Sequence, residues 1–262
     1  EFDFREGTVT QLQSAMATGE LSAEQVVRHY YRQIAQHNRR GADLRAVNQL
    51  LPLDEALAIA QELDRERAQG STRGPLHGVP VLLKDNIDTG DGLANTAGSL
   101  LLKAHVPGQD AFLVQQLRAA GAIIIGKANL SEWANFRSTA SSSGWSSVGG
   151  QVQNPFDTTR SPCGSSSGSA VAVSANLIPL AVGTETDGSL VCPAAINGIV
   201  TIKPTLGSVS RSGIIPISHS QDSAGPMART VRDAVYMLQA MLGADATDSA
   251  SYSVSTDYAQ HL

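Results

Sequence analysis

The sequence predicts an α/β fold, and three observations favour it. An apolar, β-like run occupies residues 79–83 and ends on Lys84. The helix-like segment AFLVQQLRAAG follows Asp110, and the apolar run AIIIGK comes directly after it, with the short connection typical of α/β units. Amphipathic helical segments lie on either side of these strands. We therefore expect a single α/β domain over residues 1–262, with a mixed central β-sheet covered by helices on both faces.

We predict helices in the N-terminal region, residues 1–74. Ser22 precedes the segment AEQVVRHYYRQIAQHN, and Gln25 stands three residues further on, which is a capping box. One face of this helix is apolar and consists of Val26, Val27, Tyr30, Tyr31 and Ile34. A second helix, DEALAIAQELDRERAQG, ends at Gly70, because glycine commonly ends helices. We interpret both helices as structural.

Two more helices are expected later in the chain. Asp110 is predicted to cap the helix AFLVQQLRAAG, which Gly121 stops before the buried strand AIIIGK. Thr230 starts the helix VRDAVYMLQAMLG, which closes at Gly243. The residues that follow, 244–262, are rich in Asp, Ser and Thr, and we expect a polar exit segment there.

Composition and charge exclude several classes of function. The 262 residues are 42% hydrophobic and 16% charged with a net charge of −5, which allows a sizeable core and gives no basic surface for nucleic acid. The apolar stretch 170–182 is interrupted by Ser174, Asn176 and Pro179, so we expect no membrane insertion. The six histidines form no close metal-ligand pair, and we expect no metal and no organic cofactor. The chain begins at Glu1 and not at methionine, so a cytoplasmic and a periplasmic or secreted location both stay open.

The segment 161–193 carries the strongest functional signal. It places two Gly/Ser-rich turns, SPCGSSSGSA and GTETDGSLVCP, on either side of an apolar run. Small residues in such turns let backbone N–H groups and side-chain oxygens converge on one point, as a nucleophile and its oxyanion hole require. A flexible linker is the alternative interpretation of a Gly/Ser cluster, but the apolar residues between these turns would make a poor solvated linker.

Lys84 has two possible interpretations. A surface lysine paired with its neighbour Asp85 is the ordinary one. The other is a lysine buried until it is neutral and able to accept a proton, which requires its pKa to fall by about 3 from a usual value of roughly 10.4. Burial between apolar strands and glycine-rich turns would produce such a fall.

Five motifs together resemble the amidase signature family: GVPVLLKDNI, CGSSSGSA, GTETDGS, CPAAINGIVTIKPT and SQDSAGPMART. Their order and spacing match over about residues 76–235, and we take residues 75–235 as the amidase signature core. The segments TETDGS, VCPAAINGIV and SRSGIIPIS are most similar to those of the peptide amidases in that family. The resemblance implies hydrolysis of carboxylic amides, most of all C-terminal peptide amides, to the free acid and ammonia.

The resemblance also assigns a catalytic triad. Ser189 resembles the nucleophile, Ser165 the bridging serine whose peptide bond is cis in the family, and Lys84 the base. The mechanism that follows runs through an acyl-enzyme on Ser189. Neighbouring serines occur in the same turn as Ser165, and only the family motif selects Ser165 among them.

The resemblance further implies an oxyanion hole formed by backbone N–H groups of the turn Thr186, Asp187, Gly188 and Ser189. The carboxylate of Asp187 is expected to hydrogen-bond the backbone and fix this turn, with a catalytic acid as the alternative.

Two residues are predicted to contact the substrate. Ser166 follows the bridging serine, and Trp145 lies in the low-complexity run 138–150, which covers the active site in the family and is expected to be a flexible loop. Trp133 and Phe136 either line the same pocket or pack on the core.

Other motifs are weaker candidates. Cys163 and Cys192 flank the predicted catalytic serines, but neither motif contains a histidine to activate a thiol, so we expect two small buried cysteines, while one disulfide also fits. The pattern G-x-x-x-x-G-K at 121–127 nearly matches a phosphate-binding P-loop. Ala128 stands where that loop needs a hydroxyl, and its interior is an apolar strand.

The chain departs from the family in length. Members are usually much longer, with a C-terminal half that extends the sheet and forms a wall of the pocket. The expected partners are therefore a missing C-terminal half and, from the reaction that the resemblance implies, a small amide or peptide-amide substrate. Two alternative functions stay open. One is the glutamine-hydrolysing component of a tRNA-dependent amidotransferase, and the other is a non-catalytic amidase-like binding protein.

Overall fold

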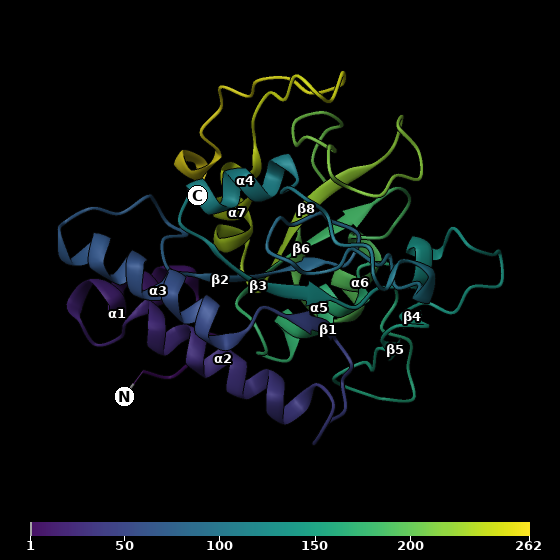
Figure 1. The fold of residues 1–262 in the computed structure, drawn as a ribbon, viewed down its shortest axis with the longest axis horizontal. Helices are drawn as coiled ribbons and strands as arrows, with labels where there is room; N and C mark the ends of the chain where they lie inside the picture. The colour runs from purple at the N-terminus through teal and green to yellow at the C-terminus, as the bar shows by residue number, and fades with distance from the viewer. Residues whose placement is uncertain (1) are drawn as a thin grey trace.

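The computed structural model describes residues 2–262, and these form a six-stranded mixed β-sheet with helices around it (Figure 1). The strands lie in the order β1 (Val47–Leu50), β3 (Ile123–Ala128), β2 (Pro80–Lys84), β6 (Leu180–Glu185), β8 (Ser223–Ala228) and β7 (Val200–Thr201). The three strands β3, β2 and β6 run parallel, while β1, β8 and β7 each join a neighbour in the antiparallel direction. The α/β class and the mixed sheet predicted from the sequence are confirmed.

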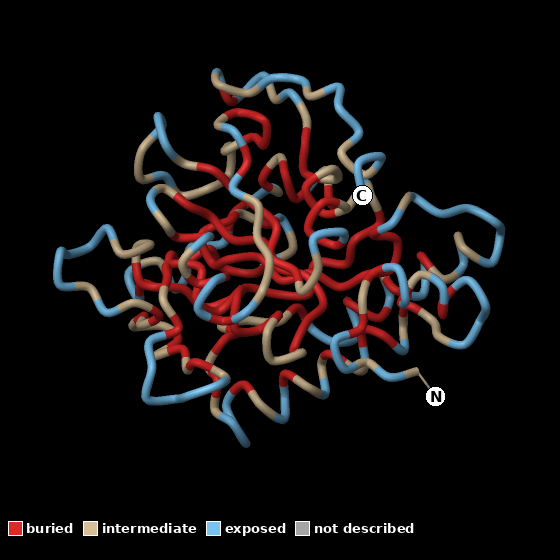
Figure 2. Tube along the Cα trace, turned by 180° about the vertical axis from the view of Figure 1, so that it is seen from behind, coloured by how far each residue is buried: buried red, intermediate tan, exposed pale blue. Residues whose placement is uncertain are grey.

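Helices cover both faces of the sheet. Every residue of β2, β3, β6 and β8 is buried, which requires cover on both sides. Helix α5 (Ser167–Ser174) contacts the strands β2, β6 and β8 (Figure 1). Helices α4 (Phe112–Ala119) and α7 (Val231–Met241) contact each other, and α4 also contacts β3 while α7 contacts β8, β7 and β6. Figure 2 shows the result, a buried interior surrounded by exposed turns. No helix within residues 2–262 is both long and apolar enough to cross a membrane.

The N-terminal region contains the two helices located from the sequence, together with a further helix, α1, and a strand, β1, that the sequence analysis missed. The helices are α1 (Val9–Thr18), α2 (Ala23–His37) and α3 (Leu53–Ala68), and β1 lies between α2 and α3. The capping box of α2 is confirmed, because the Ser22 side chain accepts from the Gln25 backbone N–H and the Gln25 side chain accepts from the Ser22 N–H. Tyr30 is fully buried, as expected for a core residue.

The predicted cap of α4 is wrong. The N-cap residue of this helix is Ala111, and no side chain caps it. The carboxylate of Asp110 instead accepts from the Gly90 backbone N–H at 2.8 Å and from Arg118 Nε at 3.0 Å. Contacts with residues distant in the sequence therefore override the local capping signal.

Two segments expected to be loose are ordered by specific contacts. The run 138–150 contributes to a small two-stranded sheet of β4 (Trp145–Ser146) and β5 (Gly150–Gln151), so it is not simply a flexible loop. The segment 244–262 contains a 3₁₀ turn, η3 (Tyr258–His261), and Asp248 in it forms an ion pair with Arg211.

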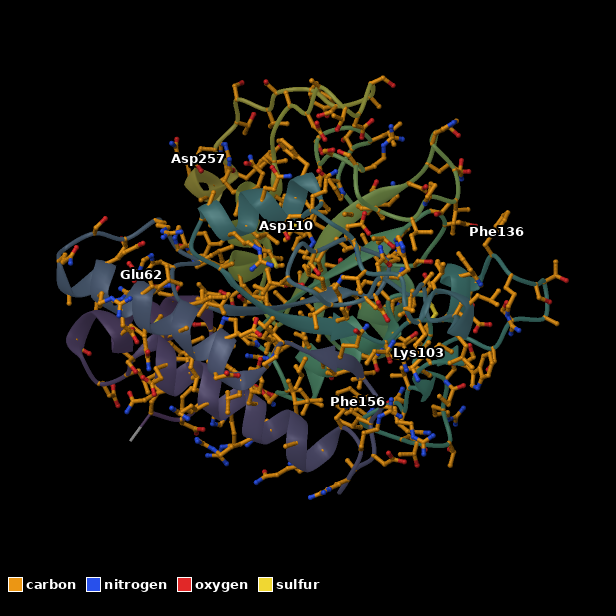
Figure 3. The ribbon with its side chains drawn as sticks, in the orientation of Figure 1. Glu62, Lys103, Asp110, Phe136, Phe156 and Asp257 are labelled. Carbon is orange, nitrogen blue, oxygen red and sulfur yellow. A yellow bond between two sulfur atoms is a disulfide. The ribbon has the colours of Figure 1, made fainter. Side chains whose placement is uncertain are left out.

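Three short helical elements complete the fold. They are η1 (Leu100–Leu102), η2 (Glu132–Asn135) and α6 (Val191–Ile196). Phe136 follows η2 and projects from the surface with 73% of its area exposed (Figure 3). Lys84 ends β2, and the turn after Glu185 follows β6. Because these two strands are parallel neighbours, their C-terminal ends lie side by side at the same edge of the sheet.

Candidate active site

Lys84 is the last residue of β2 and is completely buried. Its Nζ lies 2.7 Å from Ser165 Oγ, 2.8 Å from Thr184 Oγ1 and 3.1 Å from the Thr184 carbonyl oxygen. Burial lowers the pKa of Lys84 to about 7, although the negative charges of Glu185 and Asp222 oppose this fall. A large fraction of the amine is therefore neutral at neutral pH.

The structure excludes the surface pair between Lys84 and Asp85. The Asp85 carboxylate accepts hydrogen bonds from Asn48 Nδ2 at 2.9 Å and from the Thr96 backbone N–H and hydroxyl at 3.1 and 2.5 Å. Asp85 is also buried. Its partners hold the turn that follows β2, and Lys84 points toward β6 instead.

The contacts of Lys84 orient its lone pair. A neutral amine has two N–H donors and one acceptor site. When both donors bind the two Thr184 oxygens, the lone pair is directed at the Ser165 hydroxyl, which then donates its proton to Lys84. Thr184 was not among the residues singled out from the sequence, because it is brought into contact with Lys84 by the pairing of β2 with β6.

Ser165 follows a cis peptide bond with Gly164, as the family resemblance predicted. The side chain of Ser165 is fully buried, and its carbonyl accepts from the Ser131 N–H at 3.1 Å. A Cβ at position 164 would lie 2.3 Å from Ser131 Oγ, so a larger residue there would displace the Ser131 side chain, which accepts from the Gly144 N–H at 2.8 Å. The local packing thus holds Ser165 against Lys84.

Ser189 lies in the turn between β6 and α6 and is 7% exposed. Its carbonyl accepts from the Ser166 backbone N–H at 3.2 Å, which joins the two Gly/Ser-rich turns. The Ser189 hydroxyl forms no hydrogen bond with any other described residue. The predicted proton path from Ser189 to Ser165 therefore stays a prediction.

The turn 186–189, which we call the oxyanion turn, presents four successive backbone N–H groups, and none of them donates to another residue in 2–262. The next two N–H groups, of Leu190 and Val191, both donate to Glu185 Oε2, at 2.7 and 3.0 Å. Gly188 has φ +79°, a conformation that glycine adopts without strain. The free donors fit the predicted oxyanion hole.

Asp187 does not fix this turn, contrary to expectation. Its side chain is exposed and forms no hydrogen bond within the described residues. The buried carboxylate of Glu185 performs the bracing instead. The sequence carried a weak signal for this role, since an acidic residue four positions before the serine can reach the start of the following helix.

The other serines of the cluster have structural partners. The Ser166 hydroxyl donates to the Thr184 carbonyl at 2.9 Å and accepts from the Thr184 N–H at 3.1 Å. Ser167 donates to the Cys163 carbonyl, and Ser169 donates to the Val182 carbonyl. Because Ser166 is fully buried and both of its hydroxyl bonds go to β6, the structure does not support the predicted substrate contact of its side chain.

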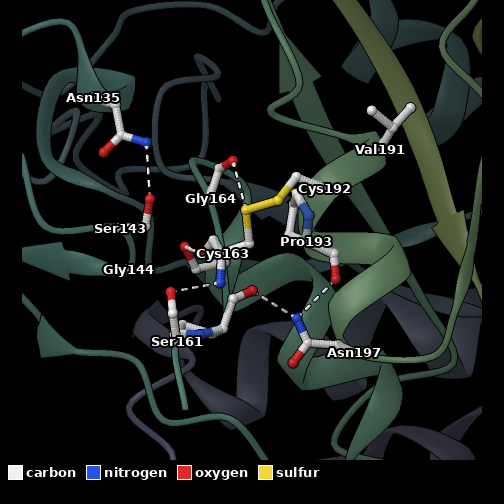
Figure 4. The surroundings of a disulfide bond; sticks show 12 residues. Asn135, Ser143, Gly144, Ser161, Cys163, Gly164, Val191, Cys192, Pro193 and Asn197 are labelled. Atoms are coloured by element: carbon white, nitrogen blue, oxygen red, sulfur yellow. Dashed lines mark hydrogen bonds between the residues drawn. A yellow bond between two sulfur atoms is a disulfide. The ribbon is translucent and has the colours of Figure 1, made fainter.

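Cys163 and Cys192 form a disulfide, which is one of the two states that the sequence left open. The bond joins the turn that carries Ser165 to the start of α6, which follows Ser189 (Figure 4). Asn197 reinforces the junction, because its Nδ2 donates to the carbonyls of Pro162 and Pro193 at 2.8 and 2.7 Å (Figure 4). The two turns are therefore held together covalently.

Removing this disulfide should lower stability. The bond closes a 29-residue separation, and the loss of that constraint on the unfolded chain corresponds to about 3.5 kcal/mol. We expect the double variant Cys163→Ala/Cys192→Ala to have a free energy of unfolding lower by that amount in urea denaturation. Wild-type protein in excess reductant is the control and should shift equally. A change below about 0.5 kcal/mol in both samples would contradict this expectation.

A cavity of about 390 Å³ opens beside the oxyanion turn, and we call it the main cavity for this position, since two larger cavities, of about 520 and 420 Å³, are lined by no residue of the site. One wall is apolar and comes from residues 213–217, and the other carries polar and charged groups. The lining residues nearest β2 and β6 are Asn86, Thr184, Glu185 and Thr186. Of these, Thr184 binds Lys84 directly, whereas Lys84, Ser165 and Ser189 are not themselves among the residues that line this cavity.

A second cavity of about 90 Å³ adjoins the first and is lined in part by Trp133 and Phe136. Trp145 lines neither cavity, and the Arg137 guanidinium lies 5.2 Å from its ring centre. Of the aromatic candidates, Trp133 and Phe136 are therefore better placed than Trp145 for contact with a ligand. Within residues 2–262 no cluster of three or more His, Cys, Asp or Glu side chains is arranged to hold a metal ion.

Comparisons with known proteins agree with this geometry. The family model described as Amidase matches residues 25–262. A glutamyl-tRNA(Gln) amidotransferase component from Acidothermus cellulolyticus is 44% identical over 93% of this chain and 46% of its own length. A Schizosaccharomyces pombe protein named as an amidase is 50% identical over 93% of the chain and 41% of its own length.

Solved structures of peptide amidases are also similar to this chain. The native peptide amidase from Stenotrophomonas maltophilia superposes with a TM-score of 0.94 at 54% identity, covering 99% of this chain and 53% of that one. A peptide amidase in complex with the competitive inhibitor chymostatin matches at 55% identity, also with a TM-score of 0.94 and the same two coverages. The chain spans about half the length of the relatives that it matches.

Proposed function

Because the chain belongs to the amidase family, we propose that it hydrolyses carboxylic amides, with C-terminal peptide amides as the substrate class. The observation that carries this proposal is the contact between the buried Lys84 amine and Ser165 Oγ at 2.7 Å. A neutral buried lysine beside a serine hydroxyl is a general base. We assign the roles of nucleophile to Ser189, bridging residue to Ser165 and base to Lys84.

The proposed reaction begins with two proton transfers. Neutral Lys84 accepts the proton of Ser165 while Ser165 accepts that of Ser189, and the Ser189 oxygen forms a bond to the amide carbonyl carbon. Negative charge develops on the carbonyl oxygen. The free N–H groups of the oxyanion turn would stabilise that charge, each by about 3 to 4 kcal/mol.

The same groups then transfer the proton in the opposite direction. Protonated Lys84 returns its proton through Ser165 to the amide nitrogen, and the C–N bond breaks. Ammonia departs, and the acyl group stays bonded to the Ser189 oxygen. Water then loses a proton along the same path and attacks the acyl carbon. The products are the free acid and Ser189 with its hydroxyl restored.

The main cavity supports the choice of substrate class. Its volume of about 390 Å³ and its mixed lining suit a peptide, which presents both apolar side chains and polar backbone groups. The inhibitor bound in a peptide amidase relative supports the same choice. Half of the length of those relatives lies outside the matched region, so further contacts with substrate can come from residues that this chain does not contain.

A second candidate is glutamine hydrolysis within a tRNA-dependent amidotransferase. Relatives named as components of the glutamyl-tRNA(Gln) amidotransferase support it. This function would require ATP and a partner protein for product formation. A non-catalytic binding protein is disfavoured, because the lysine and both serines are present and Lys84 and Ser165 are in contact.

Ammonia release tests the proposed function. The purified chain should release ammonia from C-terminally amidated peptides faster than from glutamine or simple aliphatic amides, with no change after treatment with a chelator. Faster release from glutamine would favour the amidotransferase function. Absence of release from all three substrates, with the chain alone and with a peptide amidase C-terminal half added, would contradict the proposal.

A further inference from the structure

Asp222 lies directly before β8, opposite the turn that follows β6. The antiparallel register of the two strands pairs Glu185 with Ser223, so the next residues along, Thr186 and Asp222, face each other. Thr186 Oγ1 donates to Asp222 Oδ1 at 2.5 Å. Thr186 is the first residue of the oxyanion turn, and sheet register therefore connects that turn to Asp222.

The second carboxylate oxygen of Asp222 holds a different segment. The backbone N–H groups of Ile217 and Ser218 donate to Oδ2 at 2.8 and 2.9 Å. The same loop is anchored at its other end, where the Ile215 N–H donates to the Asn86 carbonyl at 2.9 Å. One carboxylate thus joins the oxyanion turn to the loop that forms the apolar wall of the main cavity.

We propose that Asp222 is a positioning residue for the hydrolysis, because it fixes the oxyanion turn through Thr186 and fixes the cavity wall through the 217–218 backbone. The inference rests on the proposed function. A donor in an oxyanion hole is effective only when it is held in the geometry of the transition state. Asp222 provides that restraint without touching the reacting atoms.

Asp222 also contributes charge to the site. It and Glu185 are the negative groups that act on Lys84, and both raise the pKa of that amine against the effect of burial. Arg211 and His219 lie in the same cavity wall. Arg211 pairs with Asp248, and Asp222 forms no ion pair within residues 2–262, so its charge is not cancelled by direct contact.

Two substitutions separate the hydrogen bond from the charge. Thr186→Val removes the hydroxyl and keeps the carboxylate, so we expect kcat for a peptide amide to fall about 10-fold with little change in KM and no change in the acid limb of the pH profile. Thr186→Ser retains the hydroxyl and should restore kcat. Asp222→Asn should lower kcat similarly and move the acid limb to lower pH, because it removes a charge that raises the pKa of Lys84.

The matched control is Asp64→Asn. The Asp64 carboxylate in α3 also joins two segments, because it accepts from the backbone N–H groups of Ala23 and Glu24 at 2.7 and 3.1 Å, but it does not line the main cavity and does not contact Thr186. It should change neither kcat nor the acid limb. Thermal unfolding of each variant identifies loss of the fold.

The possible outcomes are distinct. If folded Asp222→Asn and Thr186→Val both retain wild-type kcat and pH profile, as Asp64→Asn is expected to, Asp222 only anchors a loop and the inference is overturned. If wild type itself is as inactive as Ser189→Ala toward amides and toward a fluorophosphonate, the proposed function fails and this inference fails with it. Loss of kcat in Thr186→Val with rescue in Thr186→Ser supports the positioning role.

Discussion

Ser189→Ala is expected to eliminate ammonia release from C-terminal peptide amides, with kcat lower by about 10⁴-fold or more. Ser189 is the last residue of the oxyanion turn, whose four backbone N–H groups donate to no other described residue, and α6 begins two residues later. Removal of its hydroxyl leaves no nucleophile there, whereas the fold should be retained because that hydroxyl has no partner within the described residues. The measurement is steady-state ammonia release with an amidated peptide, together with thermal unfolding.

Ser169→Ala is the matched control for this substitution. Ser169 is also a buried serine of the Gly/Ser-rich segment, but its hydroxyl donates to the Val182 carbonyl and does not bind Lys84. We expect it to keep kcat within about 10-fold of wild type, with a loss of stability of about 1 kcal/mol for the missing hydrogen bond. Equal losses of kcat in the two variants would contradict the assignment of Ser189.

Lys84→Met should lower kcat by about 10²- to 10⁴-fold, because it removes the general base and leaves an apolar side chain of similar length in a buried site. In the wild type, kcat/KM should rise with pH through an apparent pKa near 7, since only neutral Lys84 accepts a proton and its pKa is about 7. Below that pH the amine is protonated, and activity is lost. The measurement is the pH profile of kcat/KM, in which the limb near pH 7 should be absent from Lys84→Met.

A comparison of alanine variants tests the same role at neutral pH. Ser166 lies in the same cluster, and its hydroxyl binds the Thr184 backbone without touching Lys84. Lys84→Ala should therefore be the worse of the two in kcat, although Ser166→Ala removes two hydrogen bonds from β6. Equal losses would mean that the base is assigned to the wrong residue.

Local signals predicted much of the fold. The capping box at Ser22 and the side-chain cap at Thr230 are both present, because such caps depend only on residues three or four positions apart. Asp110 failed as a cap because Gly90 and Arg118 compete for its carboxylate. Strand β1 was missed because it is short and only its first residue is buried, so its apolar periodicity is weak.

The site was predicted only where a motif names the residue directly. The contact of Lys84 with Ser165 and the cis bond before Ser165 agree with the resemblance. Thr184 and Asp222 stand inside the motifs GTETDGS and SQDSAGPMART, but the motifs assigned them no role, since their contacts arise from the register of β6 with its neighbours. The pairing of the two cysteines likewise depends on a Cα–Cα distance of 5.9 Å between separate turns, which no local pattern encodes.

The most direct test of the central claim is to locate the covalent adduct after treatment with a fluorophosphonate. This reagent reacts with an activated serine hydroxyl, and peptide mapping by mass spectrometry identifies the modified residue. We predict a single adduct on Ser189, formed faster as the pH rises through about 7 with the deprotonation of Lys84. An adduct on Ser165, or an equal rate of labelling in Lys84→Met, would contradict the account.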